Sequence, residues 1–443
     1  MNAKRNLIMV SVAVVAGLFC SSLSFGYPTY YPTGTTKYDP AKASSGYVLI
    51  PEGYVGMNDP TYRAPEQKKD TGGRELPWVV KGEKSTEVRL IDMNGNVVNT
   101  WKVVPNFDAR ARLLPTGHLL LVDEEINGEI VEYDWKGAIV WRWKVPPGGV
   151  PHHDVHRLPN GNTLVLVDEH VPEANLKDVK DADVLWWGVI KRKGIKIIGD
   201  VIYEVTPRGE IVWAWHAHDN LDVKTFSPVV PNIDWTHGNT ITPLPENKWY
   251  DAGDKRFKPG NVLFSPRNFD KVFIIDKDTK KIVWEWTHTY KGGMSHQHEP
   301  IMVAKGLPGE GNILLFDNGL FPRHRDHNGA TIVFEINPVT KDTVWKYETY
   351  GYSNQKFFSK TKGSITRLPN GNTFISEDNN GRLFQVTPMG EIVWEYVNRS
   401  DVSRAIQYPY DFTPQLRAMP KPKEMKVTPP NNLEWHLKPD AQQ

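Results

Sequence analysis

The sequence predicts an all-β fold, a six-bladed β-propeller with a short N-terminal arm and a ring that is closed by the C-terminal segment. Three observations support this prediction. A hairpin pattern recurs six times along the 443 residues, a second kind of hairpin stands between most of these copies, and the repeat length is typical of propeller blades.

The first kind of hairpin alternates apolar and polar residues, turns at Gly, Asn, Asp or Pro, and ends in aromatic residues. Its copies are VRLIDMNGNVVNTW from Val88, IVEYDWKGAIVWRW from Ile130, VIYEVTPRGEIVWAW from Val201, VFIIDKDTKKIVWEW from Val272, IVFEINPVTKDTVWKY from Ile332 and RLFQVTPMGEIVWEY from Arg382. We expect each copy to form the two outer strands of a blade.

The second kind of hairpin supplies the two inner strands. Its copies are ARLLPTGHLLLVDEE from Ala111, VHRLPNGNTLVLVDE from Val155, ITRLPNGNTFISED from Ile365 and the looser GEGNILLFDNG from Gly309. The Pro-Asn-Gly-Asn turns supply the positive φ that a tight hairpin needs. Two hairpins make one four-stranded blade.

The repeat count leaves the first blade without an inner hairpin, because the chain enters that blade at an outer one. The segment SRAIQYP, Ser403 to Pro409, matches the inner-strand pattern HDVHRLP. We expect this segment to close the ring, with LEWHL from Leu433 as its partner strand.

The chain divides into four parts on this interpretation. Residues 1–26 form a signal peptide, with Lys4 and Arg5 before an apolar run from Leu7 to Phe19 that is too short for a stable membrane span. Residues 27–87 form an extended arm or small cap, residues 88–410 the propeller, and residues 411–443 a tail that contributes to closure. The mature protein is therefore expected to be periplasmic or secreted.

Composition limits the partners. The one cysteine, Cys20, lies in the leader, so the mature chain has no thiol and no disulfide. The 53 basic and 52 acidic residues nearly balance, and loss of Lys4 and Arg5 makes the formal charge −1. This gives no reason to expect nucleic acid as a partner. A small molecule or a protein is expected, and a homo-oligomer is possible but has no supporting feature.

Three consecutive inner strands begin with histidines, His153, His237 and His298, which should meet at one mouth of the channel. The strands that return to this mouth usually end in acidic residues, but in the blade of His237 the sequence LFSPRN places Arg267 there. Arginine binds sulfate, phosphate or carboxylate through a planar fork, and histidine can act as a nucleophile or exchange a proton. This combination predicts anion chemistry.

A metal site is the alternative for the same residues. His296 and His298 share a strand face, and HHD at 152–154 adds more potential ligands. The fixed charge of Arg267 disfavours a cation nearby. We therefore expect neither a metal nor a cofactor.

At these residues the chain resembles the bacterial arylsulfate sulfotransferases, which are exported six-bladed propellers. The matching stretches are HHDVHRLPNGNTL, DWTHGNTI, LFSPRN, SHQHEPIM and ILLFDNG, and the resemblance covers about residues 85–410. It implies transfer of a sulfuryl group from an aryl sulfate to a phenol, without a cofactor. The family's disulfide has no counterpart in the mature chain.

The resemblance also implies roles for single residues. The transiently sulfated histidine corresponds to His298, the supporting histidines to His153 and His237, and the arginine to Arg267. His152 is the alternative to His153, because the doubled histidine leaves the alignment uncertain by one position. Possible supporting residues are His296, which orients or screens, Glu299, which could hold the His298 imidazole through its other nitrogen, and Arg404 in the closing segment.

Two other function classes stay open. A non-catalytic propeller could bind a ligand or partner at the same mouth, since fold does not fix function. A metal-dependent enzyme could use the histidine-rich site.

Overall fold

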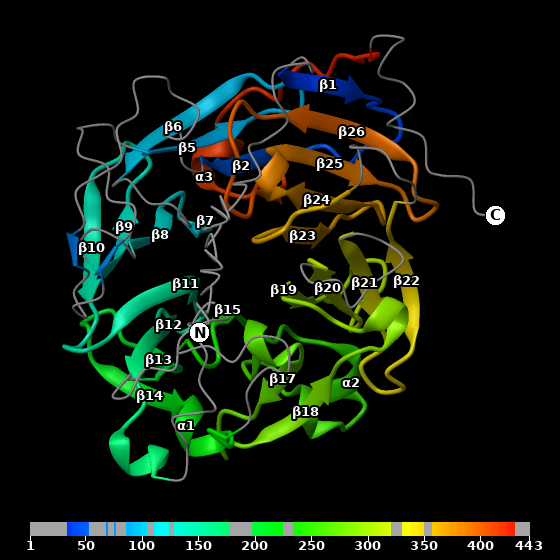
Figure 1. The fold of residues 1–443 in the computed structure, drawn as a ribbon. Helices are drawn as coiled ribbons and strands as arrows, with labels where there is room; N and C mark the ends of the chain where they lie inside the picture. Colours follow the sequence, from blue (N-terminus) through cyan, green and yellow to red (C-terminus); the bar gives the residue numbers. More distant parts are fainter. Residues whose placement is uncertain are drawn as a thin grey trace, which may run out of the picture.

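The computed structural model contains six antiparallel sheets, five of four strands and one of five, arranged around a common centre (Figure 1). It describes residues 33–52, 68–69, 75–76, 86–103, 110–123, 128–177, 197–224, 234–319, 330–349 and 357–429. The predicted all-β, six-bladed propeller is confirmed. None of the helices within these ranges has the length and apolar character that a membrane span requires.

The blades are numbered here in the chain order of their outer hairpins, and their strands are given from the centre to the rim. Blade 1 contains β27 (Ile406–Tyr408), β2 (Tyr47–Pro51), β5 (Thr86–Ile91) and β6 (Val97–Val103); blade 2 contains β7 (Ala111–Leu113), β8 (Leu119–Asp123), β9 (Glu129–Tyr133) and β10 (Ile139–Lys144); blade 3 contains β11 (Val150–Arg157), β12 (Thr163–His170), β13 (Ile198–Val205) and β14 (Ile211–His216).

The other three blades follow the same plan. Blade 4 contains β15 (Gly238–Pro243), β16 (Val262–Pro266), β17 (Val272–Ile275) and β18 (Ile282–Trp286); blade 5 contains β19 (His298–Met302), β20 (Ile313–Asp317), β21 (Ile332–Ile336) and β22 (Thr343–Tyr347); blade 6 contains β23 (Ser364–Arg367), β24 (Thr373–Glu377), β25 (Arg382–Val386) and β26 (Ile392–Val397).

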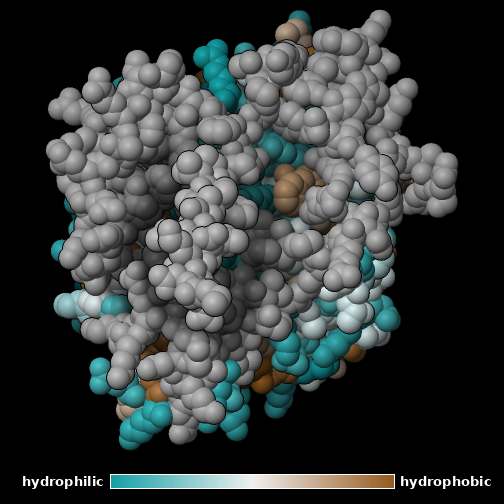
Figure 2. Space-filling view, viewed as in Figure 1, coloured by the Kyte–Doolittle hydropathy of each residue, from teal (hydrophilic) through white to brown (hydrophobic). Residues whose placement is uncertain are grey.

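The remaining elements are short. They are the helices α1 (Ala217–Asn220), α2 (Lys248–Asp251) and α3 (Pro414–Arg417), the separate pair β3 (Lys68–Lys69) and β4 (Glu75–Leu76), and the 3₁₀ turns Glu173–Leu176, Lys255–Phe257, Arg267–Phe269, Tyr290–Gly292 and Asp378–Asn380. Along the rim over β18 and α2, the described surface in Figure 2 is largely hydrophilic with a few hydrophobic side chains between.

The two ends of the described chain complete the ring. β27 is the innermost strand of blade 1, which confirms the prediction that Ser403–Pro409 closes the propeller. The short N-terminal arm is β1 (Gly34–Tyr38), which pairs with β26 as a fifth strand of blade 6.

One prediction about closure needs correction. The partner of β27 is β2, with Tyr47 opposite Tyr408 and Leu49 opposite Ile406. The proposed partner LEWHL lies outside the described residues. Because β2 belongs to a sheet, the propeller also begins before the expected boundary at residue 88. Pairing between strands from opposite ends of a chain leaves no local pattern in the sequence.

Among the described residues the hydrophobic core forms six clusters, and each lies between two neighbouring blades. Leu121 of blade 2, for example, packs in the cluster shared with blade 1, whereas the next residue, Val122, packs in the cluster shared with blade 3. Side chains alternate between the two faces of a strand, and both faces of a middle blade strand are covered. The described strands of the second position, such as β8 and β20, are therefore almost continuously apolar.

Tryptophan hydrogen bonds join every blade to the next. The indole Nε1–H groups donate to turn carbonyl oxygens of the following blade over 2.7–3.3 Å, in the pairs Trp101 to Asp134, Trp143 to Gly209, Trp215 to Lys280, Trp286 to Lys341, Trp345 to Pro388 and Trp394 to Met93. The last pair links blade 6 back to blade 1. The aromatic endings of the outer hairpins thus hold the ring together.

Deletion of residues 400–443 should abolish cooperative unfolding, because it removes β27 and leaves β2 without its inner partner. Urea titration followed by circular dichroism measures this. A chain truncated after residue 429 keeps β27 and is the matched control, which should retain one cooperative transition. A chain lacking residues 400–443 that unfolds like the full-length protein would refute this account of closure.

Candidate active site

The predicted site residues come from three consecutive blades and lie at one mouth of the ring. β15 begins directly after His237, and β16 runs antiparallel to it and ends directly before Arg267, with Gly238 opposite Pro266. His298 is the first residue of β19, the innermost strand of the next blade. His153 lies in β11, the innermost strand of the blade before.

His152, His153 and His237 form a compact cluster. The Nε2 atoms of His153 and His237 are 3.2 Å apart. The ring of His152 lies 4.0 Å from that of His153 and 5.0 Å from that of His237, centroid to centroid. His153 therefore faces His237 directly, whereas His152 packs beside both.

Carboxylates stand behind two of these rings. Nδ1 of His152 lies 2.8 Å from Asp168 and 2.9 Å from Asp200, and Nδ1 of His237 bonds to Asp234. Burial alone would lower the pKa of His152, but the two carboxylates raise it well above its usual value. Burial, followed by the charges of Arg267 and His152, holds the pKa of His237 well below its usual value. The surroundings thus favour the protonated form of His152 and the neutral form of His237.

Arg267 is tied to the same place by its backbone. Its N–H donates to the carbonyl of His237 over 3.0 Å, and its Nε donates to Asn268 over 3.2 Å. Its charge lies close enough to His237 to depress the pKa of that imidazole. The structure therefore brings the predicted arginine and His237 together.

His298 is 4% exposed, and two oxygens fix its ring. Nδ1 lies 2.7 Å from the side-chain oxygen of Asn318 and 3.1 Å from the carbonyl of His296. The amide nitrogen of Asn318 donates to the carbonyls of Ser359 and Lys362, so its oxygen faces the imidazole. Because both partners of Nδ1 are acceptors, Nδ1 carries the hydrogen, and in the neutral ring Nε2 carries the lone pair.

Sequence reasoning missed Asn318 and gave its role to Glu299. In the structure the Oε1 atom of Glu299 pairs with Arg110 of blade 2, so Glu299 does not hold His298. Glu299 has a φ of 47°, and this turn carries its side chain toward the channel. The signal that could have identified Asn318 is the LFDNG stretch, whose asparagine follows β20 where that strand returns to the mouth.

His296 and Arg404 occupy different positions. The N–H of His296 donates to Asp270 over 2.9 Å, which fastens the segment before His298 to blade 4. Arg404 of blade 1 crosses the ring, and its Nη1 donates over 2.7 Å to the carbonyl of Asn239 in blade 4. Arg404 is 1% exposed and Arg110 is fully buried. These two arginines join opposite blades within the channel.

The pKa of His152 gives a test of this electrostatic arrangement. A raised folded-state pKa means that its stabilisation is complete below about 6.5 and is lost as the pH rises through the folded value. We expect His152 to remain protonated at pH 7.5 in NMR spectra of histidine-labelled protein, with His152→Gln used for assignment. A His152 resonance that titrates at or below its ordinary pKa would contradict the arrangement.

Comparisons with known proteins agree with the resemblance seen in the sequence. No curated protein matches the chain. Similar solved structures include a protein of unknown function from Bacteroides caccae (12% identity, 82% of this chain and 99% of that chain, TM-score 0.45) and a virginiamycin B lyase from Staphylococcus aureus (11%, 84% and 92%, 0.40). The profile of the family "Arylsulfotransferase (ASST)" matches residues 147–399, a span that includes His298, His237, Arg267 and His153, and the chain therefore belongs to the arylsulfotransferase family.

Proposed function

We propose that this protein is an exported sulfotransferase that moves a sulfuryl group from an aryl sulfate to a phenol through a sulfohistidine at His298. Membership of the arylsulfotransferase family indicates the reaction class. The observation that carries the proposal is the pair of acceptors at Nδ1 of His298, which leaves the lone pair on Nε2. A buried imidazole held in this tautomer is prepared for nucleophilic attack.

In the first step Nε2 of His298 forms a bond to sulfur, and the bond from sulfur to the aryl oxygen breaks. The electron pair leaves with the phenolate. The sulfated ring retains its Nδ1 hydrogen and carries a positive charge, which the oxygens of Asn318 and His296 stabilise. The ring thus receives the sulfuryl group without first losing a proton.

In the second step the oxygen of a phenol attacks sulfur, and the bond between nitrogen and sulfur breaks. Neutral His237 accepts the phenol proton and then releases it to solvent, while the first phenolate takes up a proton from solvent, so the cycle consumes no proton. Arg267 and the cationic His152 stabilise negative charge on the sulfuryl oxygens. His153, beside His237, orients the imidazole that accepts the proton. Both substrates are small molecules.

A metal-dependent enzyme is the second candidate, because the ligand atoms of His152, His153 and His237 lie within 4.8 Å of one another. The rings of His152 and His153 are 4.0 Å apart and tilted by 30°, and the fixed charge of Arg267 opposes a bound cation. The transferase is therefore favoured. If a chelator abolished sulfuryl transfer and an added divalent ion restored it, the metal-dependent enzyme would be favoured instead.

The location of the enzyme follows from the leader and is part of the proposal. Residues 1–26 lie outside the described part of the chain. Removal of this leader on export would place the enzyme in the periplasm or the medium. N-terminal sequencing of protein recovered from those fractions checks the cleavage site, and an intact Met1 in exported protein would contradict it.

Replacement of His298 by Ala should lower the rate of phenol exchange by at least about 1,000-fold, because it removes the nucleophile. The assay measures release of a chromogenic phenol from its sulfate ester in the presence of a second phenol. His118→Ala, which removes a partly exposed histidine of blade 2, should leave the rate and the unfolding transition unchanged. A fully active H298A protein would remove His298 from the mechanism.

Asn318 is a positioning residue, and replacing it should change the pH profile as well as the rate. Asn318→Ala removes an acceptor from Nδ1 and should lower kcat by about 10- to 100-fold. Asn318→Asp keeps an acceptor but adds a negative charge that favours the imidazolium form of His298. The acid limb of kcat/KM should then move to higher pH. If both variants kept the wild-type kcat and the wild-type acid limb of kcat/KM, Asn318 would have only a structural role.

A further inference from the structure

A second cluster of side chains that could hold a metal ion lies on blade 3, farther from the channel than the site described above. Glu169 is the penultimate residue of β12, His216 ends β14, and His218 lies in α1. One ligand atom from each of these residues lies within 4.8 Å of the others. β12 and β14 both run toward the mouth, so their ends bring the three side chains together.

The three side chains converge on one carboxylate oxygen. Nδ1 of His216 bonds to Oε1 of Glu169, and Nδ1 of His218 lies 3.4 Å from the same oxygen. The His218 side chain is 9% exposed, and its Nδ1 atom is buried without a hydrogen-bond partner in the described structure. A buried ring nitrogen in this position requires a ligand or carries a desolvation cost.

The local backbone fixes the two imidazoles. His216 is the residue before α1, and the side-chain amide of Asn220 donates to its carbonyl over 2.9 Å. The amide of Asn175 donates to the carbonyl of His218 over 3.3 Å. The two rings are 5.3 Å apart, centroid to centroid, and are inclined by 51°. They are therefore not stacked and can approach one ion from different directions.

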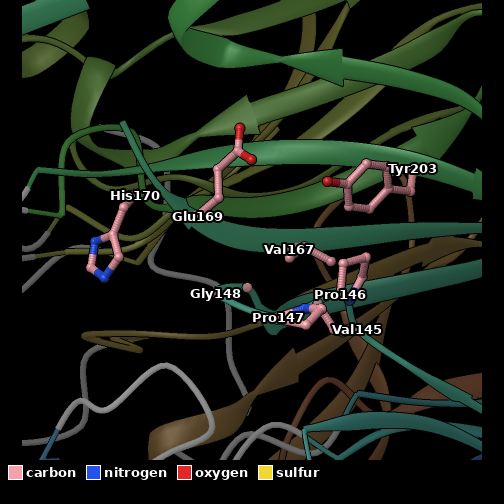
Figure 3. A pocket seen from close by; sticks show the side chains of 9 residues that line it. Val145, Pro146, Pro147, Gly148, Val167, Glu169, His170 and Tyr203 are labelled. Atoms are coloured by element: carbon pink, nitrogen blue, oxygen red, sulfur yellow. The ribbon is translucent and has the colours of Figure 1, made fainter. Parts of the chain in front are cut away.

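The cluster is reachable from solvent. Glu169 lines a pocket of about 200 Å³ beside Tyr203 and the turn at Pro147, and His170 projects to the opposite side of the strand (Figure 3). The side chains of His216 and Glu169 are 30% and 19% exposed. An ion can therefore enter, and a water molecule can complete its coordination.

We propose that Glu169, His216 and His218 form a binding site for a divalent transition-metal ion of the zinc type. Two imidazoles and one carboxylate suit zinc, whereas calcium and magnesium prefer oxygen ligands alone. The bound ion would join α1 to the end of β12. Asp168, which contacts His152, is the residue before Glu169, so the ion would also steady the strand end behind the candidate active site. The proposal does not depend on the sulfotransferase reaction.

Zinc titration calorimetry of metal-free protein that carries no histidine tag tests this site. We expect wild-type protein to bind zinc with a Kd below about 10 μM. His218→Ala should abolish one equivalent of binding or weaken it by at least about 100-fold. His118→Ala is the matched control. His118 also contacts a glutamate, Glu132 at 2.6 Å, but it belongs to none of the histidine groups that could hold a metal among the described residues.

The mouth histidines are a competing location for zinc, and His237→Ala separates the two sites. The proposal requires that H237A protein still binds the one equivalent of zinc that H218A protein fails to bind. Zinc should also raise the Tm of wild-type and H118A proteins more than that of H218A protein, while all three have similar Tm values with chelator. Unchanged binding by H218A, loss of all binding in H237A alone, or no saturable binding by the wild type would overturn the proposal.

Discussion

The hydrogen bonds that tryptophan indoles donate across the blade boundaries are the constraint on which the rest of the structure depends. Every blade donates at least one such bond to a turn of the next blade. In blades 5 and 6 the closing aromatic is tyrosine, which has no indole, and the bond comes from Trp345 and Trp394, two residues earlier. Residues two apart on a strand point to the same face, so these two tryptophans reach the following blade from the same side of the sheet as the closing tyrosines. Each bond contributes only about 0.5–1.5 kcal/mol net, but together they fix the relative position of all six sheets.

That ring brings the beginnings of the inner strands to one mouth, where carboxylates fasten them. Asp200 accepts from the N–H of Gly238, Asp270 from that of His296, and Asp378 from that of Arg404, in each case across a blade boundary. His237, His296 and Arg404 have φ values of 47°, 58° and 55°, a region that is costly for residues with a side chain. The carboxylate bonds stabilise these turns. The site is therefore rigid because the blades hold it, even though most of its residues stand at strand ends.

The repeated hairpins of the blades could be predicted from the sequence, but contacts between strands far apart in the chain could not. Period-two hairpins and closing aromatics gave six blades, and the missing inner hairpin identified Ser403–Pro409 as the closing strand. The same reasoning identified the strand GYVLIP from Gly46 but could not assign it to blade 1, because Tyr47 and Tyr408 are neighbours only after the ring closes. The blade repeat could identify four site residues, because corresponding parts of successive blades carry them. His237, His298 and Arg267 stand at strand ends, and His153 lies within β11. Asn318 also follows a strand end, in LFDNG, but its contact with His298 was not predicted. The cluster at Glu169 was missed because side-chain contacts between separate strand ends have no sequence period.

The proposed reaction depends most on His298, which carries the sulfuryl group between the two substrates. The most direct measurement is to incubate the purified enzyme with an aryl sulfate in the absence of acceptor, digest it at a pH that preserves N-sulfation, and determine the mass of each histidine-containing peptide. The account predicts one added sulfuryl group on the peptide with His298, and its loss when a phenol is added. Phenol release with an unmodified His298 peptide, or a sulfuryl group on the His237 peptide instead, would contradict it.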